Sequence, residues 1–295
     1  MIELLKYGSD HFRSFGLIPY TGNKNELLPF IASKIPGDYS RFVDVFCGGL
    51  SVAMRIPGNV IANDNCNQLI TMYRAIASLE NPVDDMFAIA TQYGLSRDNK
   101  DGYYALRDEY NRTGDPLLLW WLTTCSFSSV MRFNAGGKFN VPFGHRFPAD
   151  RAKNRLQQMV ERRLHGRISF ACEDFRNIQF LKGDFAYFDP PYLCCAAAYN
   201  SGWGEKEEKD LYNLLEKLHA RGIEWGLSNS LSNKGVDNNI LKDWLNSHPE
   251  FNVYTPQRLY YFDRMKRSEK EDNVEVYVTN VPENRQCLEK MPELI

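Results

Sequence analysis

The sequence has no apolar run of about 18 residues, the length that a membrane-spanning helix requires. Its first residues, Met1–Lys6, carry an acid and lack a long apolar core, so a signal peptide is not expected. The seven cysteines form no Cys-x-x-Cys pair and have no accompanying histidine spacing, so we expect no metal site. An odd number of cysteines without an export signal indicates reduced thiols and a cytoplasmic location.

The lack of a dinucleotide-binding motif and of a large net charge excludes two further classes of function. The pattern G-x-G-x-x-G does not occur, so a nicotinamide dinucleotide is not the expected cofactor. The net charge is only −2, which argues against a protein that coats nucleic acid indiscriminately. Positive charge is nevertheless concentrated in residues 145–167, with seven Lys/Arg against two acids, and in residues 258–270, with five against two. Both stretches could be solvated faces, but their neighbouring aromatic residues favour a localised phosphate-contacting surface.

The composition, 43% hydrophobic and 24% charged, is ordinary for a globular protein. Short β-branched and aromatic runs alternate with helical patterns and predict an α/β fold, with strands at residues 41–46, 59–63, 167–171, 184–188, 223–228, 253–262 and 274–278. Residues 68–163 are helical in pattern, which predicts an inserted helical subdomain. A further helix is expected over Glu205–Ala220. Another is expected after Asn23, and because Pro29 falls inside its pattern, it is either kinked there or begins later in the chain.

The first two predicted strands end in residues suited to a nucleoside. A glycine turn, Cys47–Gly49, follows the first strand and allows the backbone to approach a ligand closely. Asp64 ends the second strand, where an acid usually binds a ribose diol. Tyr20 and Lys24 lie near a predicted helix start, where backbone N–H groups can meet an anionic ligand group. These features favour a nucleoside cofactor, although a capped helix alone would explain Tyr20 and Lys24.

The tetrapeptide Asp189–Tyr192 follows a buried strand pattern and contains two prolines, which cannot extend the strand. It therefore turns at the carboxyl end of the strand, where open α/β sheets bind ligands. An acceptor carboxylate, stiff proline carbonyls and an aromatic face suit a planar amino-purine. A proline-stiffened loop with a capping aspartate is the structural alternative.

A β-hairpin is predicted around the Asn-Ala-Gly-Gly sequence that begins at Asn134. Its arms carry Arg132 and Asn134, side chains suited to reading guanine and adenine edges in the major groove of DNA. The exposed aromatics of such a hairpin could equally be structural, but the adjacent basic stretch favours contact with DNA.

Five motifs occur in the order seen in Dam-type DNA adenine-N6 methyltransferases: Tyr20–Lys24, Asp44–Gly49, Asn63–Asp64, the hairpin from Arg132 to Gly144, and Asp189–Tyr192. The chain resembles this family over about residues 19–280, and it looks nearest to the Dam enzyme of T-even phages. The resemblance implies a Rossmann-like S-adenosylmethionine-dependent methyltransferase sheet with an inserted helical DNA-recognition subdomain carrying a β-hairpin. It also implies methylation of a flipped-out adenine, with GATC as the site, in a bacterial or phage-infected cell.

The resemblance further implies a division of the chain and roles for individual residues. Residues 19–69 and 165–280 would form the catalytic domain and residues 70–164 the target-recognition subdomain, with 1–18 as an N-terminal extension and 281–295 as a C-terminal tail. The adenine would be held by Asp189, Pro190 and Tyr192. The cofactor pocket would be lined by Tyr20, Lys24, Phe46, Asp64, Phe175, Asp189 and Tyr199. Double-stranded DNA would be read or intercalated by Phe127, Ser128, Val130, Arg132, Asn134, Pro142 and Arg146. The protein would act as a monomer or a weak dimer on DNA.

Alternatives remain open. Similar tetrapeptides serve methylation of cytosine N4, of RNA adenine or of another DNA site, and the hairpin with its basic stretch favours duplex DNA among these. Methylation of a cytosine ring carbon requires a cysteine nucleophile, and the sequence has no Pro-Cys pair. A DNA-binding protein that keeps the cofactor pocket without turnover is the non-enzymatic alternative, against which the intact Asp189 and Tyr192 argue.

Overall fold

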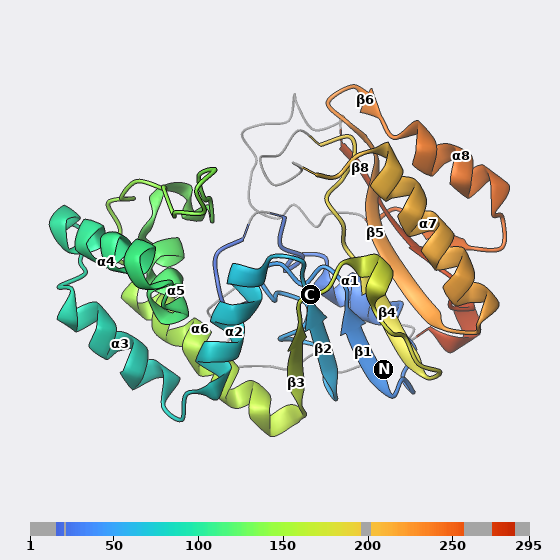
Figure 1. Ribbon diagram of the computed structural model, residues 1–295. Coiled ribbons are helices and arrows are strands. Elements are labelled where there is room, and N and C mark those ends of the chain that lie inside the picture. Colours follow the sequence, from blue (N-terminus) through green and yellow to red (C-terminus); the bar gives the residue numbers. More distant parts are fainter. Residues whose placement is uncertain (1–15, 21, 196–201, 257–272, 287–295) are drawn as a thin grey trace, which may run out of the picture.

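The computed structural model describes residues 16–20, 22–195, 202–256 and 273–286 (Figure 1). A central sheet has the strand order β3-β2-β1-β4-β5-β8-β7. The strands are β1 (Arg41–Asp44), β2 (Val60–Asn63), β3 (Ile168–Ala171), β4 (Asp184–Phe188), β5 (Glu224–Asn233), β7 (Asn252–Tyr254) and β8 (Asn273–Thr279), with β6 (Val236–Asp237) paired to β5. Strands β1 to β5 run parallel, and β8 is antiparallel to both of its neighbours. The sheet is the predicted Rossmann-like α/β sheet, with parallel strands in the order β3-β2-β1-β4-β5.

Alternate residues of the central strands enter two different cores. On β4, Phe185 and Tyr187 belong to one core, and Ala186 and Phe188 belong to the other. The first core is completed by α1 (Leu28–Ser33) and α2 (Asn67–Ser78), and the second by α7 (Glu205–Ala220) and α8 (Asn239–Ser247). Because both faces are covered, neighbouring residues within these strands are apolar and do not alternate with polar ones, as at Phe42 and Val43 of β1 and at Phe185–Phe188 of β4.

The predicted helical stretch forms a block of helices beyond β3 (Figure 1). Its members are α3 (Pro82–Gln92), α4 (Lys100–Thr113), α5 (Pro116–Cys125) and α6 (Ala149–Arg162). Asp115 caps α5, as its carboxylate accepts a hydrogen bond from the Leu117 backbone N–H at 2.9 Å. No helix among the described residues is both long and apolar enough to cross a membrane.

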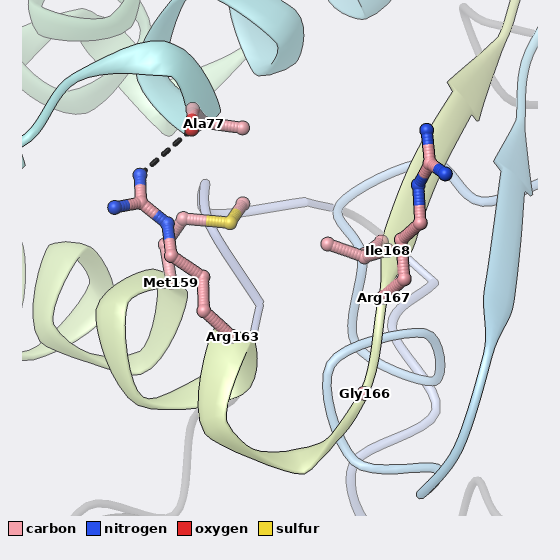
Figure 2. A pocket seen from close by; sticks show the side chains of 6 residues that line it. All are labelled: Ala77, Met159, Arg163, Gly166, Arg167 and Ile168. Atoms are coloured by element: carbon pink, nitrogen blue, oxygen red, sulfur yellow. Dashed lines mark hydrogen bonds between the residues drawn. The ribbon is translucent and has the colours of Figure 1, made fainter.

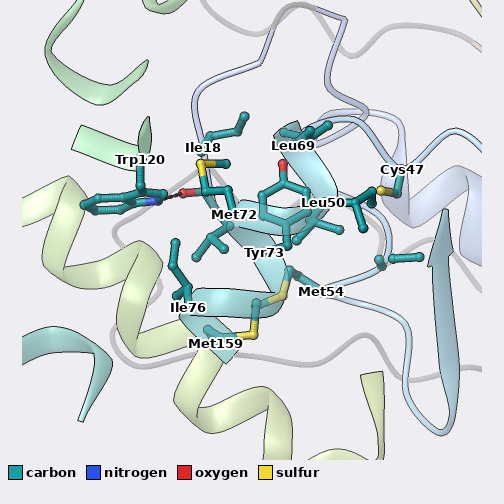
Figure 3. Close-up of a cluster of buried hydrophobic side chains, with 14 of the residues drawn as sticks. Ile18, Cys47, Leu50, Met54, Leu69, Met72, Tyr73, Ile76, Trp120 and Met159 are labelled. Atoms are coloured by element: carbon teal, nitrogen blue, oxygen red, sulfur yellow. Dashed lines mark hydrogen bonds between the residues drawn. The ribbon is translucent and has the colours of Figure 1, made fainter. Parts of the chain in front are cut away.

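One continuous cluster of apolar side chains joins the helical block to the sheet (Figure 3). Trp120 of α5 packs beside Met72 of α2, and its indole N–H donates to the Leu17 carbonyl at 2.9 Å. Leu50 and Met54, from the loop after β1, lie in the same cluster. The loop that follows the first strand is therefore held by the helices that carry the hairpin.

The later start expected for the first helix is confirmed: it begins at Leu28, and Pro29 occupies its first turn, where a missing N–H costs no hydrogen bond. Other local expectations were wrong or incomplete. The short β6 and the helix α8 were not predicted. Leu17 and Ile18, assigned to the N-terminal extension, are buried in the core. Val281 and Gln286 are buried too, so the beginning of the expected tail is packed. The predicted strand over residues 253–262 lies partly outside the described residues.

Candidate active site

Three acidic residues meet at one edge of the sheet because β1, β2 and β4 are parallel neighbours. Asp44 ends β1, Asp64 follows β2, and Asp189 follows β4. The carboxyl ends of parallel strands are the ordinary place for a ligand in an open α/β sheet. The candidate site is therefore this edge.

Asp189 is held in a compact polar cluster. Lys24 Nζ lies 2.7 Å from Asp189 Oδ1, and both side chains are largely buried, at 7% and 17% exposure. The Tyr192 hydroxyl donates to the same carboxylate oxygen at 3.3 Å, and Lys24 Nζ lies 5.2 Å from the centre of the Tyr192 ring. Lys24 also donates to the Gly22 carbonyl at 3.1 Å. The arrangement brings a hydrogen-bond acceptor, a cation and an aromatic face into one small space.

Burial raises the pKa of Asp189 above its ordinary value, and the adjacent Lys24 ammonium opposes that rise. Burial and the Asp189 carboxylate raise the pKa of Tyr192 well above its ordinary value, so the phenol stays neutral. Asp189 consequently can accept hydrogen bonds or a proton, whereas Tyr192 offers a neutral ring.

Asp64 is fixed by two backbone donors. Its Oδ2 accepts from the Gly48 N–H at 3.2 Å and its Oδ1 from the Cys66 N–H at 2.9 Å. Burial raises the pKa of Asp64, and these two N–H groups oppose the rise. The preceding Asn63 donates to the carbonyls of Val45 and Glu173, each at 3.0 Å, and so ties β2 to the loops on either side. The carboxylate of Asp64 is thereby aimed at the edge shared with the glycine turn.

Tyr20 packs directly on that glycine turn. A Cβ atom at Gly48 would lie 2.8 Å from the Tyr20 ring, and one at Gly49 would lie 2.5 Å from Tyr20 Cβ. Gly48 also has a φ of +42°, in the left-handed region that favours glycine. The Tyr73 hydroxyl donates to the Gly48 carbonyl at 2.6 Å. The two glycines are therefore required for close packing of Tyr20 against the turn.

Three aromatic rings gather beside Asp64 and the end of β1. Phe46 and Phe175 have ring centroids 5.6 Å apart, and Trp203 lies 5.5 Å from Phe46 and 5.6 Å from Phe175. Phe46 and Phe175 were predicted from the sequence, but Trp203 was not. Nothing local in the sequence distinguishes Trp203, because its partners come from two distant loops. Tyr199, which was predicted to line the same pocket, lies outside the described residues.

Asp44 is a buried acid behind this edge. Its Oδ1 accepts no hydrogen bond from any described residue. Burial and the carboxylate of Asp189 raise the pKa of Asp44 well above its ordinary value, while the Ala53 backbone N–H opposes the rise. A buried acceptor without a partner is costly. The side chain is therefore suited to a donor supplied by a ligand.

The predicted hairpin lies on the same side of the molecule as the carboxyl ends of the strands (green in Figure 1). Its two arms pair through isolated bridges at Ser126–Phe143 and Phe133–Phe139 and not as regular strands. The returning arm is anchored on α4, since the Tyr103 hydroxyl donates to the Val141 carbonyl at 2.9 Å. At the start of the outgoing arm, the 3-10 turn Phe127–Ser129 has left-handed residues at Ser128 and Ser129.

The structure places the seven predicted DNA-contact residues in two groups. Six are exposed, namely Phe127, Ser128, Val130, Arg132, Asn134 and Pro142, while Arg146 is half-buried. Phe127 has 63% of its surface exposed, which is unusual for a phenylalanine. Arg132 Nε donates to Asn140 Oδ1 at 2.9 Å, and its terminal nitrogens donate no hydrogen bond within the described residues. Asn134 Oδ1 instead accepts from the N–H groups of Gly136 and Lys138, so this oxygen serves the hairpin tip.

The basic stretch over residues 145–167 is less available than its charge suggests. Arg162 is fully buried and donates to the carbonyls of Ile56 and Gly58, at 3.2 and 2.8 Å. Arg155 is also buried. Arg162 fastens α6 to the loop after β1. The interpretation of the whole stretch as a phosphate-contacting surface was therefore wrong for these two buried arginines. Most of the second basic stretch lies outside the described residues.

A pocket of about 430 Å³ opens at the opposite edge of the sheet, between the end of α2, the end of α6 and the start of β3 (Figure 2). Arg163 lines it, but its Nη2 is occupied by the carbonyls of Ala77 and Leu79, each at 2.7 Å. Ile168 begins β3, so the pocket lies at the amino end of that strand and far from the edge that carries Asp189. It is no part of the candidate active site. Among the described residues, no group of three or more His, Cys, Asp or Glu could hold a metal.

The chain matches a family model described as D12 class N6 adenine-specific DNA methyltransferase over residues 20–262. It is 31% identical over 277 residues to the type II methyltransferase M.FokI of Planomicrobium okeanokoites, covering 88% of this chain and 42% of that protein. The modification methylase StsI of Streptococcus sanguinis gives the same identity and coverage over 283 residues. A DNA adenine methylase of Serratia marcescens is 26% identical over 242 residues, covering 77% of this chain and 85% of that protein. The chain thus spans about two fifths of the length of the first two relatives.

Proposed function

Because the chain belongs to the D12 class N6 adenine-specific DNA methyltransferases, we propose that it transfers a methyl group to N6 of an adenine flipped out of duplex DNA. The observation that carries the proposal is the cluster of Asp189, Lys24 and Tyr192 beside the pocket of Asp64 and the aromatic rings. GATC, the site implied by the resemblance to Dam-type enzymes of T-even phages, is the first sequence to test. Action as a monomer or weak dimer is part of the same proposal.

The residues at the sheet edge fit S-adenosylmethionine, the methyl donor of such methyltransferases. Phe46 and Phe175 would flank its adenine, and Asp64 would accept hydrogen bonds from its ribose diol. The partnerless oxygen of Asp44 lies among the acids and would favour the positively charged methionine end. Tyr20 and Lys24 would close the pocket from the side of the glycine turn. When bound, the cofactor supplies an electrophilic methyl group on a positively charged sulfur.

The chain's own task is to hold the target amino group in line with that methyl group. Asp189 and the Pro190 carbonyl would accept the two N6 hydrogens, while the base stacks on Tyr192. Acceptors aimed at both hydrogens favour a geometry in which the N6 lone pair is available for attack. One N6 proton must leave after transfer, and Asp189, whose pKa burial raises, is the acceptor at hand.

The hairpin would supply site recognition. The terminal nitrogens of Arg132 can bond the O6 and N7 edge of a guanine, and Phe127 and Val130 can enter the base stack. Asn134, Ser128, Pro142 and Arg146 would support the approach to DNA from the same element. In this proposal residues 70–164 act as the recognition subdomain, and residues 19–69 with 165–280 form the catalytic domain.

The test is to incubate the purified protein with labelled S-adenosylmethionine and unmethylated duplex DNA, and then to map the methylated bases. N6-methyladenine within GATC would support the whole proposal. Adenine methylation at another sequence would keep the reaction and reject GATC. Methylation of cytosine N4 or a preference for RNA would reject adenine in duplex DNA as the substrate, and cofactor binding without any transfer would reject the enzymatic function.

A further inference from the structure

Glu208, in the first turns of α7, is an acid with no exposed surface. No cation pairs with it among the residues that the structure describes. Its carboxylate instead accepts four hydrogen bonds, from Trp203 Nε1 at 2.7 Å, the Tyr212 hydroxyl at 2.5 Å, Asn229 Nδ2 at 2.9 Å and Asn238 Nδ2 at 2.8 Å. All four groups act as donors, so Glu208 is an acceptor at both oxygens.

The two carboxylate oxygens serve different purposes. Oε1 accepts from Tyr212, Asn229 and Asn238, which lie on α7, on β5 and at the N-cap of α8. These three bonds hold the fold together. Oε2 accepts from Trp203 alone. Glu208 Oε2 thus bonds only Trp203, whose ring contacts are Phe46 and Phe175 of the candidate cofactor pocket.

Trp203 has no other polar anchor in the described part of the chain. Its indole ring lies against Phe46 and Phe175, at centroid distances of 5.5 and 5.6 Å. The next residue, Gly204, is fixed in the same way, since its N–H donates to Glu207 Oε2 at 3.0 Å. Two consecutive acids on α7 therefore set the position of the two residues that precede the helix.

We propose that Glu208 is a positioning residue that holds the Trp203 indole as the third aromatic wall of the cofactor pocket. The inference rests on the proposed function, because it assigns a wall of the same pocket. A buried polar oxygen is costly unless it is hydrogen-bonded. The bond to Trp203 would satisfy the second oxygen of Glu208 and at the same time orient the indole plane toward the cofactor adenine.

The substitution Glu208→Gln separates the bonds of Oε1, which hold the fold, from the bond of Oε2 to Trp203. The amide oxygen can take the place of Oε1 and keep the three bonds that hold the fold. The amide nitrogen then faces the Trp203 N–H, so two donors meet and that bond is lost. Trp203→Phe is the matched partner, because it removes the N–H with which the glutamine conflicts while it keeps an aromatic ring.

Binding of S-adenosylhomocysteine is measured by calorimetry for the wild type, both single variants and the double variant, with methyl transfer measured beside it. We expect Glu208→Gln to weaken binding about tenfold, with KM for the cofactor rising while kcat at saturating cofactor changes little. In the Trp203→Phe background, the same substitution should have less than about a twofold further effect. The ligand should also change the Trp203 fluorescence, taken as the difference between wild type and Trp203→Phe.

An equal loss in both backgrounds would overturn the inference, because Glu208 would then act through the fold and not through Trp203. If Glu208→Gln does not fold, Trp203→Ala is compared with Trp203→Phe. Trp203→Ala should bind the cofactor product more weakly than Trp203→Phe does. Binding equal to that of the wild type in both variants would overturn the inference. If the wild type binds the cofactor and transfers methyl groups, but the effects of the Glu208 and Trp203 substitutions are independent, the inference is rejected and the proposed function stands. A wild type that neither binds cofactor nor transfers methyl groups would reject the proposed function as well.

Discussion

The sheet edge around Asp189 and the hairpin between α5 and α6 are built in opposite ways. At the sheet edge, Asp189 and Lys24 are largely buried and bonded to each other. On the hairpin, Phe127 is 63% exposed, and Arg132 and Asn134 are exposed as well. Only the inner side of the hairpin, with Phe139 and other apolar residues, is buried.

The difference matches the two tasks that the proposed function gives these regions. Groups that guide a reaction gain from burial, because the low local dielectric strengthens each interaction and the geometry is set in advance. Groups that read a base sequence must keep their polar ends free until DNA arrives. The inner side of the hairpin is held in place by hydrogen bonds to Tyr103 and Asn111 of α4. The hairpin can therefore expose such groups on its outer side and still keep its shape. Substitutions in the two regions should therefore change different quantities.

The largest effect is expected at the sheet edge. Asp189→Ala should lower the rate of methyl transfer about a thousandfold, because the acceptor for the N6 hydrogens is lost. Folding and cofactor binding should largely survive, as seen by circular dichroism and calorimetry. Asp108→Ala, at an acid with 75% of its side chain exposed on α4, is the control and should transfer normally. Substantial turnover by Asp189→Ala would contradict the assignment.

A change on the hairpin should alter the choice of site. Arg132→Ala should lower kcat/KM at the preferred site about 10- to 100-fold, since a bidentate arginine–guanine contact contributes about 1–3 kcal/mol of discrimination. Methylation should spread to related sequences, measured by sequencing the methylated positions. Arg112→Ala, at an exposed arginine paired with Glu109, is the control. An unchanged site preference in Arg132→Ala would show that the hairpin does not read the site through this residue.

The Lys24–Asp189 contact predicts a pH effect confined to the sheet edge. Lys24 opposes the rise in the pKa of Asp189, so Lys24→Met should raise that pKa further. Because transfer needs an ionised Asp189, the acid limb of the kcat–pH profile should move to higher pH. Lys24→Arg keeps the positive charge and should move the limb less. A profile for Lys24→Met that coincides with the wild type would argue against this coupling.

The smallest effect concerns stability. Burial raises the pKa of Asp44 in the folded state, so its contribution to stability is present below the unfolded pKa and is lost as pH rises through the folded pKa. Asp44→Asn should therefore stabilise the protein by about 1 kcal/mol at neutral pH, and this gain should vanish in acid. Thermal unfolding across pH measures it, with Asp98→Asn, at an exposed acid, as the control. A gain independent of pH would contradict burial of the charge as the cause.

Much of the sheet could be predicted because its signals are local. Strands such as Asp184–Phe188 are short apolar runs bounded by turns, and parallel pairing then brings their carboxyl ends together. The contact between Lys24 and Asp189 could be anticipated only through the resemblance, since 165 positions separate the two residues in the sequence. The α8 helix was missed because its apolar face is short, with only Leu241 and Trp244 buried.

Other features depend on tertiary contacts that no local pattern records. The charge run over residues 145–167 cannot reveal that Arg162 is buried against backbone carbonyls. The oxygen of Asn134 could have been expected to serve its own turn, since asparagine side chains commonly accept from a backbone N–H two residues further on. The roles of Trp203 and Glu208 could not be predicted from local sequence, because both depend on contacts with residues from β5, α8 and the loop after β1.

In the proposed function the hairpin selects the site and Asp189 carries out the chemistry. This separation is tested by the sequence preference of the Asp189→Ala protein, selected from a random duplex library and compared with the methylation map of the wild type. We expect the inactive protein to enrich the same site that the wild type methylates. Enrichment of a different sequence, or none, would contradict the separation of the two regions.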